Sequence, residues 1–328
     1  MKLTEEKELK QLLTDIDHHD LITIGLSCHA ICLIEKSGLL HTLLQGQPFK
    51  EAQIDSYKNP PLLKVALNTL IAGGFICFEK GIYFLTSFGR RIANHASTMS
   101  MVFSGYGKLL SKQFELLEGP EKWSNADIDY KAVALASIGF GAVDLDPLLL
   151  EILERLCPQN AICDLGCGTG EKIVKICDAL DVNGIGIERD EGVIECSHRF
   201  TANCPRVKIV RGDIQNLSGV WADVDVVLIS FVYHDIRSGE ECTHFLQSLR
   251  KCFPNMTSLV VVDIVSLSES LPTMMSSFEY VHGLQGFYPR NYESTLNTFT
   301  HGGFEMVEEK KVPNMPNTFI WVLKAGTG

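Results

Sequence analysis

The stretch AICDLGCGTGEKI, residues 161–173, decides the fold of this chain. Apolar residues typical of a buried strand lead to Asp164, and Gly166, Gly168 and Gly170 then alternate before a helix-like segment. Glycine loses more backbone entropy on folding than any other residue, so three in five positions indicate a turn that needs them. A strand, a glycine turn and a helix together predict a ligand site at the carboxyl end of the strand.

The spacing of the glycines argues against two phosphate-binding motifs. A dinucleotide fingerprint requires G-x-G-x-x-G, and the third required position is Glu171 here. A P-loop requires a Lys-Ser/Thr pair after its glycines, whereas this chain continues with EKIV. The turn is therefore not built for a phosphate.

Strand-like and helix-like patterns alternate after residue 160. Apolar strands expected at 161–165, 184–190, 207–213, 223–235 and 258–265 are separated by helical segments. This alternation predicts a parallel sheet covered on both faces. Residues 291–304 predict a helix, and 305–314 and 317–325 predict two strands joined by a short Pro/Asn turn. The expected fold is α/β, a Rossmann-like doubly wound sheet of seven strands with an antiparallel C-terminal hairpin.

Residues 1–95 predict a mainly helical domain. MKLTEEKELKQLL at the start predicts a charged helix without the apolar core of a signal peptide. Apolar residues at helical spacing follow at 20–44 and 59–75, and FICFEKGIYFLT at 75–86 alternates around Lys80-Gly81 as a hairpin does. Two helices and a hairpin give a winged-helix-like outline. Residues 96–150 predict linking helices at 101–119 and 146–156, with a loop around 120–140.

Composition and charge restrict the partners. The 328-residue chain has a net charge of −11 and no Lys/Arg run, which argues against nucleic acid as a partner. The helix at 62–73 carries only Lys64 as a charge, so we expect it to pack on a second copy of the chain in a homodimer. No stretch approaches the ~20 apolar residues of a membrane span. Eleven scattered cysteines without a CxxC pair predict buried free thiols and a cytoplasmic location.

Carboxylates stand at the ends of three successive strands, and in a doubly wound sheet they gather at one edge. Together they repel a pyrophosphate and suit a ligand with a positive charge, a ribose and an amine, which describes S-adenosylmethionine (SAM). We expect Asp164 to hold the methionine ammonium, directly or through water, and Glu188 to accept from the ribose hydroxyls. Asp213, after Gly212, would accept from the adenine amine, and Ser230 completes the candidate cofactor contacts.

These motifs resemble the class I SAM-dependent methyltransferases, through DLGCGTG, the Glu188 strand and the Gly212-Asp213 pair. FLTSFGRRIA at 84–93 and VLISFVYHDIRSGEEC at 227–242 resemble the wing and the catalytic segment of the dimeric small-molecule O-methyltransferases. The resemblance implies an enzyme of secondary metabolism that uses SAM and a small-molecule acceptor. Residues 1–95 would form the dimerisation domain, 96–150 part of the acceptor pocket, and 151–328 the catalytic domain.

The same resemblance assigns catalytic residues. His234 would end its strand beside the glycine turn, where an imidazole titrating near pH 6.5 can accept a proton. The family places its general base there, followed here by Asp235, and Asp263 matches the acid that orients it. In GLQGFYPRNYES, Arg290 keeps the place of the family's arginine, but the family's nearby glutamate is replaced by Pro289.

A second histidine, His282, follows in FEYVHGLQG. With GYGKLL at 105–110, it resembles the bacterial α-keto acid C-methyltransferases, such as those of phenylpyruvate and 2-ketoarginine, which bind a divalent metal with two histidines. The resemblance implies that His234 and His282 hold iron, cobalt or zinc, a Lewis acid for a keto acid whose C3 carbon must lose a proton.

Three functions follow from these residues. We prefer methylation of the C3 carbon of an α-keto acid, and the alternative is O-methylation of a phenol or hydroxyl with His234 as general base. A winged-helix regulator that senses SAM is a remote third possibility. Each residue also has a simpler structural interpretation: Asp235 as a helix cap, Asp263 as a strand-end cap, and His282 as a packed helix histidine.

Overall fold

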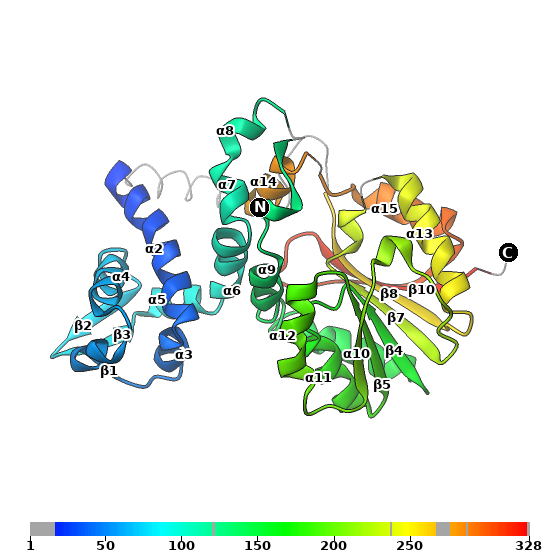
Figure 1. The fold of residues 1–328 in the computed structure, drawn as a ribbon, viewed down its shortest axis with the longest axis horizontal. Helices are drawn as coiled ribbons and strands as arrows, with labels where there is room; N and C mark the ends of the chain where they lie inside the picture. The colour runs from blue at the N-terminus through cyan, green and yellow to red at the C-terminus, as the bar shows by residue number, and fades with distance from the viewer. Residues whose placement is uncertain (1–16, 120–121, 237, 267–275, 287, 327–328) are drawn as a thin grey trace. The chain divides into compact units, whose positions relative to one another are not determined.

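The computed structural model describes residues 17–119, 122–236, 238–266, 276–286 and 288–326 (Figure 1). The helix expected over 1–13 lies outside these residues. The chain divides into two compact units, residues 1–104 and 105–328. Among the described helices, none combines the length and the apolar character needed to cross a membrane.

The first unit packs helices against a small sheet with the strand order β1-β3-β2. Its helical elements are α2 (His18–Lys36), α3 (Leu39–Leu44), a 3-10 helix (Glu51–Ser56), α4 (Pro60–Ala72), α5 (Ser87–Ala93) and α6 (Ala96–Ser100). Its strands are β1 (Phe49–Lys50), β2 (Ile76–Glu79) and β3 (Ile82–Leu85). Asn59 caps α4 by accepting from the Leu62 amide at 3.2 Å, and prolines occupy the first turn, where no intrahelical N–H is needed.

The predicted hairpin at 75–86 is confirmed. β2 and β3 pair antiparallel, with Ile76 opposite Leu85. Lys80 and Gly81 between them have φ values of 48° and 78°. Positive φ at both central residues is what a two-residue hairpin turn requires, because it matches the right-handed twist of the strands.

The second unit contains the seven-stranded sheet, with the order β6-β5-β4-β7-β8-β10-β9. Its strands are β4 (Ala161–Leu165), β5 (Asn183–Glu188), β6 (Val207–Arg211), β7 (Val224–Ser230), β8 (Ser258–Ile264), β9 (Phe304–Lys311) and β10 (Thr318–Ala325). β4 to β8 pair in parallel, whereas β10 runs antiparallel to both β8 and β9. The expected fold class and the antiparallel C-terminal hairpin are therefore confirmed.

Helices cover both faces of this sheet (Figure 1). α13 (Gly239–Cys252) and α15 (Tyr292–His301) pack on one face, in a core that includes the buried Trp321. α10 (Asp146–Leu156) and α11 (Glu171–Leu180) pack on the other. Every residue of β4 and β8 is buried, as expected for strands covered on both sides. α12 (Glu191–Thr201) packs against β5 and β6.

The linking region departs from the prediction in two places. The loop expected around 120–140 contains a 3-10 turn (Asn125–Asp127) and α9 (Tyr130–Ser137), whose cap Asp129 accepts from the Ala132 amide at 2.9 Å. The single helix expected at 101–119 is broken into a π-helical turn (Met101–Gly105), α7 (Gly107–Ser111) and α8 (Gln113–Leu116). Gly105 and Gly107 favour such a break because glycine weakens a helix interior.

Candidate active site

The glycine turn follows β4 and has a backbone conformation that favours glycine. Gly166, Gly168 and Gly170 have φ values of 77°, 55° and 72°. A Cβ on Gly166 would lie 2.7 Å from Val232 Cγ2, and one on Gly170 would lie 2.9 Å from Ile209 Cδ1. Both contacts are too short for carbon atoms, so the turn admits no larger residue at either position without a shift.

Glu188 ends β5 and fastens this turn to its neighbouring strand. Its Oε2 accepts from the Gly168 amide at 3.1 Å, and its Oε1 accepts from the amides of Arg189 and Asp190 at 2.8 and 2.9 Å. An ionised carboxylate has about four acceptor positions, so one more donor can be accepted. A ribose hydroxyl fits that capacity, while the bonds already present hold the carboxylate still.

Asp164 is buried at the end of β4 and lacks part of its hydrogen bonding. Its Oδ1, like the Oγ of Ser230 on adjacent β7, has no hydrogen-bond partner among the described residues. Burial raises the pKa of Asp164 to about 7, against the lowering effect of the Lys172 charge. Buried polar atoms are nearly always paired in native proteins, so these two atoms could accept hydrogen bonds from a ligand. The ammonium of SAM matches this requirement.

Asp213 follows β6, the third strand of this edge. Its carboxylate accepts from the Gln215 amide at 3.1 Å and from Asn216 Nδ2 at 2.9 Å. Gly212 precedes it, and a Cβ there would lie 3.0 Å from Ile187 Cγ2. The parallel order of β4, β5 and β6 brings the three acids to one edge of the sheet, as the sequence predicted.

His234 lies beyond β7 and does not end it, which corrects the sequence-based expectation. It occupies a 3-10 turn, Tyr233–Asp235, four residues after Ser230. Its Nδ1 is 2.6 Å from Asp263 Oδ1, and its amide donates to Asp263 Oδ2 at 2.7 Å. Burial opposes its charged form, but the carboxylates of Asp263 and Asp235 together prevail and raise the pKa of His234. Asp263 thus fixes both the backbone and the ring of the histidine.

His282 faces His234 from α14 (Ser276–Leu284). The two ring centres are 5.1 Å apart, and Phe278 contacts both rings. His282 Nδ1 lies 2.7 Å from the Phe278 carbonyl, so the proton of the neutral ring is on Nδ1 and the lone pair on Nε2. Burial, aided by His234, lowers the pKa of His282 to about 3. The ring is therefore neutral in the physiological range.

Asp235 adds a carboxylate to the two histidines. Its Oδ1 is 3.6 Å from His234 Nε2, and one donor atom each of His234, Asp235 and His282 lies within 4.8 Å of the others. Two imidazoles and one carboxylate are a known donor set for divalent first-row metals. The sequence indicated the two histidines as ligands and gave Asp235 a catalytic role only. Its position directly after His234 was the one signal that could have identified it as a third donor.

Arg290 supports the turn that carries His234 and Asp235. Its Nη2 donates to the Tyr233 carbonyl at 2.8 Å, and its Nη1 donates to the Ile236 carbonyl. Its guanidinium also lies over the Tyr233 ring, 4.9 Å from the centre. The residue therefore holds the main chain on both sides of the histidine and the aspartate.

Comparison with known proteins agrees with this geometry. Residues 162–254 match the methyltransferase domain family. The chain is 29% identical over 313 residues to the indolepyruvate C-methyltransferase of Streptomyces griseus, covering 93% of each protein. The structure of mitomycin 7-O-methyltransferase matches with a TM-score of 0.65 at 14% identity, covering 99% of this chain and 100% of that one. A methyltransferase of calicheamicin biosynthesis, solved with S-adenosylhomocysteine (SAH), matches with a TM-score of 0.59 at 17% identity, covering 97% and 99%.

The fold and the glycine-turn edge define a class I SAM-dependent methyltransferase, and this chain is one. It is an enzyme that transfers a methyl group to a small molecule. The SAM-sensing regulator is therefore set aside.

We expect SAH binding to depend on pH through Asp164. The ammonium of the ligand favours the carboxylate, so a protein whose Asp164 is protonated must release a proton on binding. Affinity should rise as pH increases from about 5 to 7, by up to about tenfold per unit, and level off above that. Calorimetry in buffers of different ionisation heat measures the released proton. Asp164→Asn should bind weakly and without this dependence, and proton-neutral binding by the unmodified protein at about pH 6 would contradict the assignment.

We expect Arg290 to contribute measurably to stability through the two carbonyls. Arg290→Met leaves both without their charged donor and should lower the free energy of unfolding by about 2–4 kcal/mol. Arg290→Lys should retain part of this because a single ammonium cannot span both carbonyls. Urea denaturation checks the series, with the exposed Arg250→Lys on α13 as control. Equal stability of Arg290→Met and the unmodified protein would show that the two hydrogen bonds from Arg290 to these carbonyls do not stabilise the fold.

Proposed function

We propose that the enzyme methylates the C3 carbon of an α-keto acid, and that His234, His282 and Asp235 hold a divalent metal for this reaction. The observation that carries the proposal is the three-donor cluster, whose donor atoms lie within 4.8 Å of one another. Ligands on one metal at about 2.1 Å lie roughly 3–4 Å apart, and the 3.6 Å between His234 Nε2 and Asp235 Oδ1 falls in that range.

The surroundings of the two histidines support this proposal. Metal-bound histidines usually donate their other ring N–H to a carboxylate or a carbonyl, which fixes the ring. His234 Nδ1 lies against Asp263, and His282 Nδ1 lies against the Phe278 carbonyl. In both rings Nε2 is therefore the nitrogen that would bind the metal. The low pKa of His282 keeps that ring neutral, as a metal ligand must be. The name of the Streptomyces griseus relative, a C-methyltransferase of indolepyruvate, points to the same class of acceptor.

The chain's residues have separate tasks in this reaction. SAM carries the methyl group on a sulfonium, and the metal, when bound, stabilises negative charge on the keto acid as a Lewis acid. Asp164 and Ser230 receive the amino-acid end of SAM, while Glu188 and Asp213 receive the nucleoside. Asp263 and Arg290 hold the His234 turn in place. By fixing both reactants, these groups place the acceptor carbon in line with the methyl group at near-attack distance. Once the C3 proton has passed to solvent, the new carbon–carbon bond would form as the carbon–sulfur bond of SAM breaks and SAH leaves.

Metal content and hydrogen exchange test the proposal together. Protein purified without a histidine tag should contain a divalent metal, and His282→Ala and Asp235→Asn should each lose most of it. Without SAM, the unmodified enzyme should exchange the C3 hydrogen of an α-keto acid with deuterated water faster than the solution does. Chelation or either substitution should slow this exchange about 10–100-fold.

His244→Ala is the matched control, because this exposed histidine on α13 is not one of the three proposed ligands. It should retain full metal content and full exchange. Metal-free protein that is fully active and methylates a hydroxyl group would reject the metal and the carbon acceptor together.

O-methylation with His234 as general base is the second candidate. The observation that favours it is the His234–Asp263 pair, because a carboxylate that raises the pKa of a buried imidazole also makes a proton acceptor. This candidate requires His234 and assigns no chemical task to His282.

We further propose that the enzyme is a cytoplasmic homodimer assembled through residues 1–95. All eleven cysteines are free thiols, which supports a reducing compartment. The N-terminal half of α2 exposes between 42% and 58% of each of Leu21, Ile22, Ile24 and Leu26. On α4, which packs on α2, Leu62 and Val65 are 49% and 61% exposed. A second copy of the same helices would bury these side chains, as a two-fold interface does.

Charged substitutions on these helices test the dimer. We expect light scattering to give the mass of two chains for the unmodified protein and of one chain for Leu26→Glu with Val65→Glu, because each carboxylate would be buried without a partner. Gln47→Glu, an isosteric change in an exposed loop of the same unit, should remain dimeric. A monomeric unmodified protein, or a doubly substituted protein that stays dimeric, would refute this interface.

A further inference from the structure

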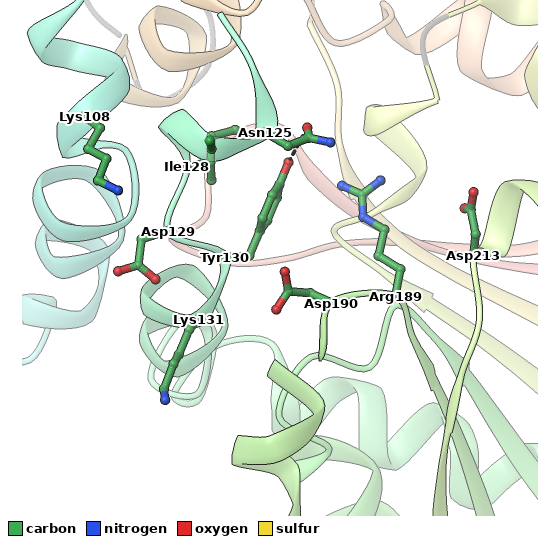
Figure 2. A pocket seen from close by; sticks show the side chains of 10 residues that line it. Lys108, Asn125, Ile128, Asp129, Tyr130, Lys131, Arg189, Asp190 and Asp213 are labelled. Atoms are coloured by element: carbon green, nitrogen blue, oxygen red, sulfur yellow. Dashed lines mark hydrogen bonds between the residues drawn. The ribbon is translucent and has the colours of Figure 1, made fainter. Parts of the chain in front are cut away.

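A pocket opens beside the carboxyl ends of β5 and β6 in the second unit (Figure 2). Its volume is about 640 Å³, which is within the range of small-molecule sites. Arg189, Asp190 and Asp213 line it from the strand ends. The opposite side consists of Lys108 and the segment 125–131, the part of the chain that sequence reasoning treated as a loop.

The strand-end side of this pocket is the nucleoside end of the SAM site. Asp213 is the residue that we assign to the adenine amine, and Arg189 and Asp190 directly follow Glu188, which we assign to the ribose. The amides of Arg189 and Asp190 donate to the Glu188 carboxylate, so both residues are held close to the ribose position. A nucleoside at this edge therefore lies against this pocket.

Tyr130 and Arg189 join the two sides of the pocket. The Arg189 guanidinium carbon is 5.3 Å from the centre of the Tyr130 ring. Tyr130 OH donates to Asn125 Oδ1 at 3.0 Å, and Asp129 caps α9 directly before it, so the ring is held from both directions. Figure 2 shows Arg189 extending from the end of β5 towards Tyr130, with Lys131 directed away from it.

The helix behind Tyr130 covers the cofactor turn. α9 packs against α12, the helix that follows β5. A Cβ on Gly168 would meet only Ala134, at 3.7 Å, so α9 passes over the middle of the glycine turn in ordinary contact distance. The Tyr130–Arg189 contact is therefore at the edge of a helical cover over the SAM site.

We propose that Arg189 and Tyr130 form a clasp that closes the nucleoside end of the SAM pocket and slows the dissociation of SAH. A planar guanidinium stacks on aromatic faces, and the adenine base offers such a face beside the tyrosine ring. Both residues would act as positioning residues for the cofactor. The proposal rests on SAM-dependent activity and not on the carbon or oxygen identity of the acceptor.

Calorimetry with SAH alone, without acceptor or added metal, tests the clasp. Arg189→Met and Tyr130→Ala should each raise the Kd for SAH about three- to thirtyfold, and the dissociation rate in stopped flow should rise by a similar factor. Because the two side chains act as one contact, the double variant should be little weaker than either single variant. Tyr130→Phe keeps the ring and should lie closer to the unmodified protein than Tyr130→Ala does.

Arg199→Met is the matched control, since this exposed arginine on α12 loses the same charge outside the pocket and should leave the Kd unchanged. An unchanged Kd for Arg189→Met would overturn the proposal. Strictly additive effects in the double variant would also overturn it, because they would show two independent contributions and no clasp. Neither result bears on the metal or the acceptor, which are tested by hydrogen exchange.

Discussion

Two buried carboxylates at the carboxyl edge of the sheet determine how this enzyme is organised, and they differ in how completely they are paired. Asp263 accepts from the amides of His234 and Ile264 and lies against the ring of His234, so the protein itself satisfies it. Asp164 keeps one oxygen without a partner among the described residues, and burial raises its pKa to about 7. Burying an unpaired charge is costly. The paired Asp263 carboxylate therefore holds the His234 turn rigidly, whereas Asp164 has an oxygen that a cationic ligand could pair with.

The proposed cofactor site and the histidine site therefore occupy different parts of the carboxyl edge of the sheet. At β4, β5 and β6, acids and a glycine turn meet at one edge of the sheet, where we propose that SAM binds. After β7, a short turn carries His234. Asp263 holds the side chain of His234, and Arg290 holds the main chain of the turn. The helix α14 brings His282 against the His234 ring. Each site is assembled from residues distant in sequence, and the parallel order of the strands is what brings them together.

The sequence predicted the parts that depend on local chemistry and on strand order. The glycine turn, the strand-end acids, the seven-stranded sheet and its antiparallel hairpin follow from spacing and periodicity, which act over short distances. α9 was missed because it is short and its cap, Asp129, lies in a polar stretch typical of loops. The turn after β7 is not predicted, because Phe231, Val232 and Tyr233 continue the apolar and aromatic run of the strand. The place of Asp235 beside both histidines, and of Arg189 beside Tyr130, depends on contacts between distant segments that no local pattern records.

The position of the transferred methyl group shows most directly whether the site activates carbon. The enzyme is supplied with SAM labelled with carbon-13 in its methyl group and with an α-keto acid that has an aromatic side chain, and the product is examined by carbon NMR. We expect a labelled methyl group bonded to C3, seen as carbon–carbon coupling when that carbon is also labelled, and formed only by protein that contains a divalent metal. A labelled methyl group on oxygen, formed equally well after chelation, would contradict this expectation.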